Sequence, residues 1–131
     1  MTELAGRVQL TVSPCHRRLR QLERSGAIRG YHAVVDPAAL GLAFEALVFV
    51  TMRHEDRETL LSFEQAVAEI PNVLLAQQLF GDPDYLLRIV TADLTAYQQL
   101  EDDVLSALPG VQRLNSTLVM KRVVDDRPFP A

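Results

Sequence analysis

Residues 44–53, FEALVFVTMR, decide the fold of this chain, because they have the composition of a β-strand with two apolar faces. Successive side chains of a strand point to opposite faces of the sheet. One face carries Ala46, Val48, Val50 and Met52, and the other carries Leu47 and Phe49. A sheet that meets water on one side alternates apolar with polar residues. The pattern therefore predicts a strand that is covered on both sides.

The sequence after this strand alternates between helical and strand patterns. Residues 56–70 and 94–108 repeat apolar side chains at helical spacing, and each run ends at a proline. Residues 73–80, 85–92 and 111–124 have strand patterns, and the GDPD between the first two predicts a hairpin. With the opening strand, the order is βαββαβ. This order predicts an α+β fold of the ferredoxin-like type, with an antiparallel sheet and both helices on one face.

The sheet face that the two helices leave open is also predicted to be apolar. Leu86 and Leu87 repeat in a second strand the two-sided apolar pattern of residues 46–52. Because no second layer of helices is predicted, we expect another copy of the chain to cover this face and form a homodimer. Partial cover by the linker and the N-terminal helices is the alternative.

The sequence before the strand, TVSPCHRRLRQLERSGAIRGYHAVVDP (11–37), predicts a helix from about Val12 to Ser25. Ser13-Pro14 is a start signal and Gly26 a stop signal. The apolar stripe of this helix holds Val12, Cys15, Leu19 and Leu22, and the opposite stripe holds Ser13, Arg17, Arg20 and Arg24. A short helix predicted at 2–8, a turn and this longer helix match the geometry of a helix-turn-helix that reads DNA.

Positive charge is concentrated in this part of the chain. Residues 1–36 carry six arginines and three carboxylates, a net charge of +3, whereas the whole chain carries −4. Such asymmetry predicts one part that meets an anionic partner and a second part with another role. On charge alone, a solvated basic helix is the simpler interpretation.

The patterns divide the chain into four segments. Residues 1–27 are predicted to form a partial winged or helix-turn-helix head. Residues 28–41 form a linker, with a strand over Ile28–Val35 and a turn after it. Residues 42–124 form the ferredoxin-like domain, and residues 125–131 form a proline-rich tail at the surface.

Composition argues against several other classes of protein. Apolar residues make up 48% of the 131 residues, which is enough for a packed core. No apolar run approaches the ~20 residues of a membrane span, and no cationic start precedes an apolar stretch as in a secretory signal. The single Cys15 excludes an internal disulfide and suits the cytoplasm. We therefore expect a cytoplasmic protein with no membrane partner.

Catalytic and metal sites are not predicted. Cys15 and His16 are neighbours on a helix and point about 100° apart, so they are poorly aimed as a nucleophilic pair. His32 and His54 lack the spacing of a metal site. Asp82 and Asp84 resemble a carboxylate pair, but no other catalytic group accompanies them. We expect no enzyme activity, no metal and no cofactor.

Several of these stretches resemble one family. Residues 3–41, ELAGRVQLTVSPCHRRLRQLERSGAIRGYHAVVDPAALG, resemble without a gap the helix-turn-helix and linker of the Lrp/AsnC family of bacterial and archaeal transcription regulators. GDPDYLL (81–87) resembles the sheet turn of that family, although many relatives have an aromatic residue at Pro83. LPGV (108–111) resembles its last helix stop.

The resemblance implies a DNA-binding head and a domain that responds to an amino acid. The implied DNA contacts are Ser13, His16, Arg17, Arg18, Arg20 and Arg24. The implied effector contacts lie near the sheet turn, at the junction between dimers, and are Gly81, Asp82, Asp84, Tyr85, Ser116 and Thr117. A turn that caps its own backbone is the other interpretation of Asp82 and Asp84. Dimers of this family are expected to assemble further, as an octamer of four dimers or as another closed ring.

The sequence departs from the family at its start. The usual head has three helices, and here only about two residues precede Glu3, so the chain is expected to begin at the second helix. One hypothesis is a regulator whose assembly and DNA affinity respond to an effector. A second is a truncated effector-sensing and oligomerisation module that does not itself bind DNA. A third, a small enzyme on the same scaffold, has no catalytic residues to support it.

Overall fold

A computed structural model of the chain describes residues 12–130. The chain divides into two compact units, Met1–Val35 and Asp36–Ala131, and each is described by itself. The helix predicted at 2–8 lies outside the described residues. Within the described range, no helix is both long enough and apolar enough to cross a membrane.

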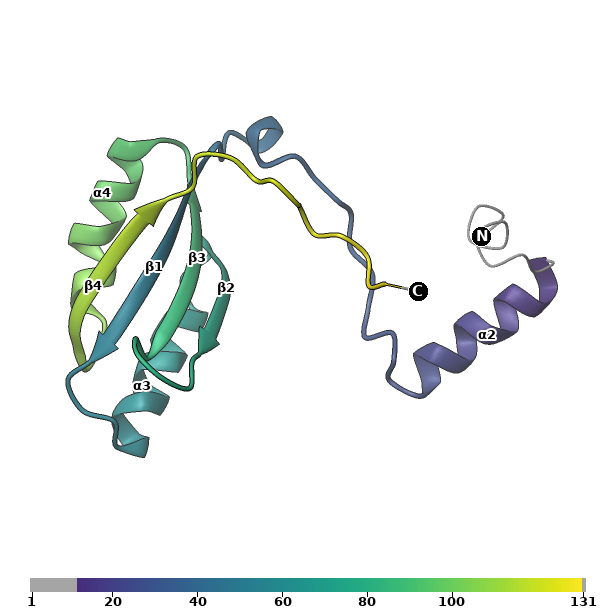
Figure 1. Ribbon diagram of the computed structural model, residues 1–131, viewed down its shortest axis with the longest axis horizontal. Coiled ribbons are helices and arrows are strands. Elements are labelled where there is room, and N and C mark those ends of the chain that lie inside the picture. Colours follow the sequence, from purple (N-terminus) through teal and green to yellow (C-terminus); the bar gives the residue numbers. More distant parts are fainter. Residues whose placement is uncertain (1–11, 131) are drawn as a thin grey trace. The chain divides into compact units, whose positions relative to one another are not determined.

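The second unit is a four-stranded antiparallel sheet with two helices on one of its faces (Figure 1). Its main elements are β1 (Phe44–Met52), α3 (Arg57–Ala68), β2 (Val73–Gln78), β3 (Tyr85–Thr91), α4 (Leu94–Asp103) and β4 (Val111–Leu118). Two short 3-10 helices, η1 (Pro37–Leu40) and η2 (Leu105–Ala107), precede β1 and β4. The strand order is β2-β3-β1-β4, which confirms the ferredoxin-like α+β fold predicted from the sequence.

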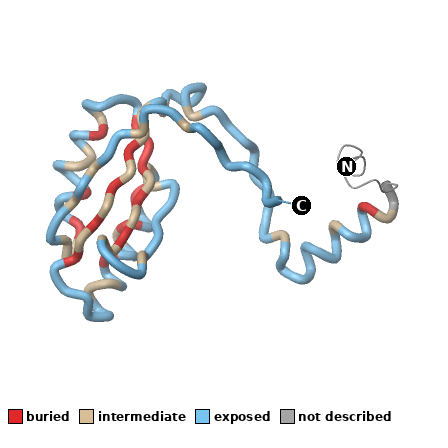
Figure 2. Tube along the Cα trace, in the orientation of Figure 1, coloured by how far each residue is buried: buried red, intermediate tan, exposed pale blue. Residues whose placement is uncertain are grey.

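The core lies between the central strands and the two helices. Ala46, Val48 and Val50 of β1 are fully buried, and Figure 2 shows burial concentrated on β1 and β3. These side chains alternate with partly exposed ones along β1, as the two-residue period of a strand requires. The buried residues that complete the cluster include Phe63 and Val67 of α3, Leu87 and Ile89 of β3, Tyr97 of α4, and Leu105.

Aspartate side chains fix the start of both helices in this unit. Asp56 accepts a hydrogen bond from the Thr59 N–H at 3.0 Å and caps α3. That backbone hydrogen bond, together with one from the Thr59 hydroxyl, lowers the pKa of the Asp56 carboxyl. Asp93 caps α4 in the same way through the Ala96 N–H, at 2.8 Å. Such caps satisfy N–H groups that have no partner within a helix.

Three predicted segments differ from the structure. The last strand ends at Leu118 rather than at residue 124, because its antiparallel partner β1 begins near that point: Leu118 pairs with Ala46, and one more bond joins Val119 N to Glu45 O. The helix predicted to reach residue 108 ends at Asp103, and η2 then turns Leu105 into the core. The linker strand predicted at 28–35 is not formed, since the described residues offer no strand to pair with it.

A charged cluster joins the chain after β4 to the start of β1. Glu45 Oε1 accepts a hydrogen bond from Arg88 Nε at 3.1 Å and a second one from the Arg122 guanidinium. Arg122 also donates to Asp125 at 2.9 Å. The side chain of Glu45 is only 13% exposed. Its negative charge is therefore poorly hydrated, and the two arginines compensate for the lost water. The cluster thereby holds residues 122–125 near the sheet.

Replacement of Glu45 by glutamine is expected to lower the unfolding free energy by about 1 kcal/mol. The amide keeps the shape of the carboxylate, but it leaves Arg88 without this charged acceptor and Arg122 with Asp125 alone. Urea denaturation followed by circular dichroism measures the change. In the matched control Asp125→Asn, the altered side chain is 57% exposed, so the change should stay below about 0.5 kcal/mol. Equal effects of the two substitutions would contradict this account.

Candidate functional site

Helix α2 (Val12–Arg24) is the described part of the first unit that carries the predicted DNA contacts. Its single basic last-turn residue is Arg24, and the chain leaves the helix at Gly26, where φ is +84°. A left-handed residue after a helix is ordinarily glycine, because other side chains are strained there. The helix predicted at about Val12–Ser25 is thus confirmed to within one residue.

The two sides of α2 differ in exposure. Cys15 is 3% exposed, as predicted for a small core residue, and Leu19 is partly buried. Leu22, at the end of the apolar stripe, is 45% exposed, so burial decreases toward the end of the helix. The side chains of His16, Arg17, Arg18, Arg20 and Arg24 are all exposed. Five basic or ionisable side chains are therefore accessible to solvent or to a polyanion. Ser13 also lies in α2, but the structure does not describe its side chain.

The sheet turn between β2 and β3 is tied to the end of β1. Asp84 Oδ2 accepts a hydrogen bond from Met52 N at 2.7 Å, and Asp84 N donates to Val50 O at 2.9 Å. The turn closes on itself through Leu79 N and Asp84 O, at 2.8 Å. Gly81 has a φ of +140°, which favours glycine. Asp84 therefore has the structural role of a capping residue, whatever else it binds.

A second carboxylate lies beside Asp84. A hydrogen bond with Asp84, and next the negative charge of Asp84, raise the pKa of the exposed Glu55 carboxyl. Glu55 and Asp84 line a hollow of about 380 Å³ together with Leu60, Gln78, Leu79, Phe80 and Gly81. Two carboxylates at the rim of a partly apolar hollow can accept hydrogen bonds from a cationic group such as an ammonium.

The six predicted effector residues do not come together in one chain. Gly81 and Asp84 line the hollow, and Asp82 is exposed in the same turn. Tyr85 is 3% exposed and points beneath the sheet, where its hydroxyl donates to Glu64 at 2.6 Å.

Ser116 and Thr117 lie on opposite faces of the edge strand β4. The Ser116 hydroxyl bonds the Tyr97 hydroxyl of α4 at 2.5 Å, whereas Thr117 is exposed opposite Leu47. A site that used all six residues would need parts of more than one copy of the chain.

Glu55 lines the hollow beside Asp84, and the sequence analysis did not single it out. It lies in a charged loop, HED (54–56), that has the composition of an ordinary solvated connection. Its place beside Asp84 depends on where β1 ends and on the hydrogen bond between Asp84 and Met52. The two residues are separated by β2 and α3 in sequence, so only the sheet register could have brought them together.

The sheet face opposite the helices carries an apolar patch, which we call the open face and define by Leu47, Phe49 and Leu86. All three side chains are partly exposed. Phe49 pairs with Leu86 across β1 and β3, and Leu47 pairs with Arg88. Neighbouring side chains of β4 on this face, Asn115 and Thr117, are polar and exposed. The patch is thus apolar with a polar border on its β4 side.

Comparisons with known proteins agree with this architecture. Residues 45–129 match the Lrp/AsnC ligand binding domain, and residues 1–29 match a winged helix-turn-helix DNA-binding domain. The Bkd operon transcriptional regulator of Pseudomonas aeruginosa is 36% identical over 93% of this chain and 80% of its own length.

Two solved structures have the same fold over nearly the whole chain. A transcriptional regulator from Neisseria meningitidis in complex with L-Met has a TM-score of 0.88 at 34% identity, covering 98% of this chain and 82% of its own. A feast or famine regulatory protein from M. tuberculosis, complexed with L-methionine, has a TM-score of 0.77 at 28% identity, covering 97% of this chain and 84% of its own.

A DNA-binding head joined to a ferredoxin-like ligand-binding domain defines a class of transcriptional regulators that respond to an effector. Within this class, the chain belongs to the Lrp/AsnC family. The family consists of regulators rather than enzymes, which agrees with the absence of a predicted catalytic site in the sequence.

Proposed function

We propose that this chain binds DNA through the exposed arginines of α2 and responds to an amino acid at the hollow beside Asp84, in the cytoplasm. The observation that carries the DNA-binding part is the distribution of exposure on α2: Cys15 is buried while Arg17, Arg20 and Arg24 are exposed. Arginine can neutralise phosphates and read guanine edges with two hydrogen bonds. An α-helix of this kind fits the major groove.

A gel-shift series with the full chain and the DNA upstream of its own gene tests the DNA-binding part. Affinity should fall steeply between about 50 and 200 mM salt, because phosphate contacts release counterions. A flat salt profile would contradict contacts dominated by phosphate. Absence of a shift at any salt would instead support the second hypothesis, an effector-sensing module that does not bind DNA.

Replacement of Arg20 by alanine is expected to weaken DNA binding about tenfold and to lower the slope of log K against log salt by about 1, since one phosphate fewer is neutralised. Arg20 is exposed on α2, so the substitution should leave the fold intact. Fluorescence anisotropy with labelled DNA measures both quantities. The control Arg57→Ala removes the same charge from the start of α3. Equal losses of DNA affinity in Arg20→Ala and Arg57→Ala would mean that the net charge of the chain, rather than contacts made by α2, controls binding.

The hollow beside Asp84 supports the effector part of the proposal. An amino acid presents an ammonium, which needs acceptors, and a carboxylate, which needs donors. Glu55 and Asp84 supply acceptors, whereas the described lining of the hollow contains no basic side chain. The donors would come from a neighbouring copy, as expected for a site at the junction between dimers. Two relatives have been solved with L-methionine bound, so methionine is the first ligand to test.

Calorimetric titration of the full chain with each of the twenty amino acids tests the effector part. Saturable heat with one or a few amino acids, together with a change in DNA affinity, supports it. Allosteric coupling of this kind is typically about 1–3 kcal/mol, or roughly 5- to 150-fold in affinity. If none of the twenty alters either assembly or DNA affinity, the effector is not an amino acid.

Assembly completes the proposal. The open face supports a homodimer, because two identical apolar patches related by a twofold axis can cover each other. We propose that dimers associate further, up to an octamer, and that the effector biases this association. Sedimentation of the full chain with and without methionine measures the species present.

A further inference from the structure

The edge strand β2 is left partly uncovered by the helices. On the helix side of β2, the side chains of Ala76 and Gln78 are exposed, although the strand beside it, β3, is buried there. The result is a groove of about 400 Å³ between α3 and β2. Small-molecule sites in proteins have volumes of about 300–1,000 Å³, so the groove has the size of a ligand site.

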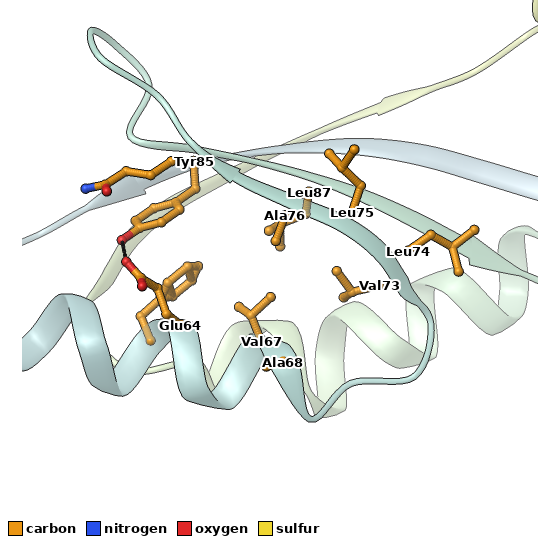
Figure 3. Close-up of a pocket in the computed structure, with 11 residues that line it drawn as sticks. Glu64, Val67, Ala68, Val73, Leu74, Leu75, Ala76, Tyr85 and Leu87 are labelled. Carbon is orange, nitrogen blue, oxygen red and sulfur yellow. Dashed lines mark hydrogen bonds between the residues drawn. The ribbon is translucent and has the colours of Figure 1, made fainter. Parts of the chain in front are cut away.

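Most of the groove wall is apolar. Val67 and Ala68 of α3 form one side, Val73 and Ala76 of β2 form the other, and Leu87 lies between them (Figure 3). Leu87 and Val67 are buried in the core, so this wall is rigid. The two alanines keep the groove wide, because a larger side chain at either position would occupy it. An aliphatic chain of four or five carbons fits such a wall.

One end of the groove is polar and rich in acceptors. The Tyr85 hydroxyl donates to Glu64 Oε2 at 2.6 Å, as Figure 3 shows, which leaves Glu64 Oε1 and the lone pairs of the tyrosine oxygen free to accept. Gln78 lines the same end, and the oxygen of its amide can accept a further hydrogen bond. Burial and then the hydrogen bond to Glu64 raise the pKa of Tyr85, so the tyrosine stays protonated at neutral pH. No basic residue is among the described residues that line the groove.

We propose that the groove between α3 and β2 binds a small amphipathic primary amine, with its ammonium on Glu64 and its aliphatic chain between Val67 and Ala76. A primary ammonium has three N–H donors and one positive charge. The three N–H donors can bond to the Glu64 carboxylate, the Tyr85 oxygen and the Gln78 carbonyl oxygen. Hydrogen bonds between charged partners are stronger than neutral ones, so the site is expected to prefer an ammonium over a neutral donor.

The same geometry discriminates against an amino acid. The α-carboxylate of an amino acid would lie beside the Glu64 carboxylate, and no arginine, lysine or histidine of the described lining would balance it. A neutral alcohol lacks the positive charge that the Glu64 carboxylate attracts. Amine binding in the groove does not depend on DNA binding or on the hollow beside Asp84, although Gln78 lines both the groove and the hollow.

Titration of the full chain with 3-methylbutylamine tests the inference. We expect saturable shifts of backbone amide resonances in α3 and β2 and a dissociation constant of about 1 mM, a value typical of so small a ligand. Leucine has the same side chain with an added carboxylate, and 3-methylbutan-1-ol has the same chain without charge. Both should bind at least about tenfold more weakly. Equal binding of either compound, or shifts centred on Gly81 and Asp84, would overturn the inference.

Two variants locate the contacts. Glu64→Gln keeps the shape of the side chain but removes the charge, and it should weaken amine binding about five- to tenfold, a limited loss because Glu64 is exposed to water. Ala76→Leu should abolish binding by filling the groove. The control Glu58→Gln removes one charge from the first turn of the same helix, outside the groove, and should leave binding unchanged. Unaltered binding by Glu64→Gln, with circular dichroism showing an intact fold, would also refute the site.

Discussion

Replacement of Asp84 by alanine is expected to lower the unfolding free energy by about 2–3 kcal/mol. The Asp84 carboxylate accepts the N–H of Met52 at 2.7 Å, and Met52 is 5% exposed. Alanine would leave this N–H without a partner and without access to water, which costs about 1–3 kcal/mol. The backbone bond between Asp84 N and Val50 O does not involve the side chain, so the variant retains it. Because the lost acceptor is a carboxylate, the expected value lies near the upper end of that range.

Urea denaturation followed by circular dichroism measures this decrease in stability. Asp84→Asn keeps a carbonyl oxygen that can accept from Met52, so its cost should be only about 1 kcal/mol. Asp82→Ala changes the exposed carboxylate in the same turn and should alter stability by less than about 0.5 kcal/mol. A similar small effect of all three substitutions would contradict the capping role of Asp84.

The strands and helices of the ferredoxin-like unit were predictable because their signals are local. The two-residue period of 44–53 and the helical period of 56–70 predict β1 and α3 to within two residues. Asp56, Asp93 and the prolines mark helix boundaries through capping and steric effects that act within one turn. The order of these elements then restricts the topology to the observed one.

Features that depend on a distant partner were not predictable in the same way. The last strand continues its pattern to residue 124, but it ends at Leu118 because β1 begins opposite to it. The linker at 28–35 has the composition of a strand, yet strand structure requires a second backbone. In both cases the local sequence pattern indicates that the segment can form a strand. The strand forms only where a second backbone is available to pair with it.

The candidate site shows the same division. Gly81 and Asp84 were identifiable as turn residues, whereas the direction of Tyr85 is set by its position in β3, where it pairs with Val50 and faces α3. Ser116 and Thr117 are neighbours in sequence, and the alternation of a strand places them on opposite faces. Their proposed roles in effector binding stay predictions.

Replacement of Phe49 by aspartate is expected to convert the proposed dimer to a monomer. Phe49 lies at the centre of the open face, beside Leu86, and is partly exposed in the single chain. Burial of such a side chain contributes about 1.5–3 kcal/mol. A twofold interface contains the change twice, so the dimer is weakened by about 3–6 kcal/mol, or roughly 10²- to 10⁴-fold in the dissociation constant. Facing aspartates would add repulsion at the same place.

Sedimentation velocity over a range of concentrations measures the dissociation. The control Leu61→Asp places the same charge on α3, at a side chain that is 46% exposed on the helix side of the domain, and the dimer should persist. Because Phe49 points away from the core cluster, the Phe49→Asp monomer should keep its circular dichroism spectrum. A folded Phe49→Asp variant that remains dimeric would mean that the open face is covered by something other than its own copy.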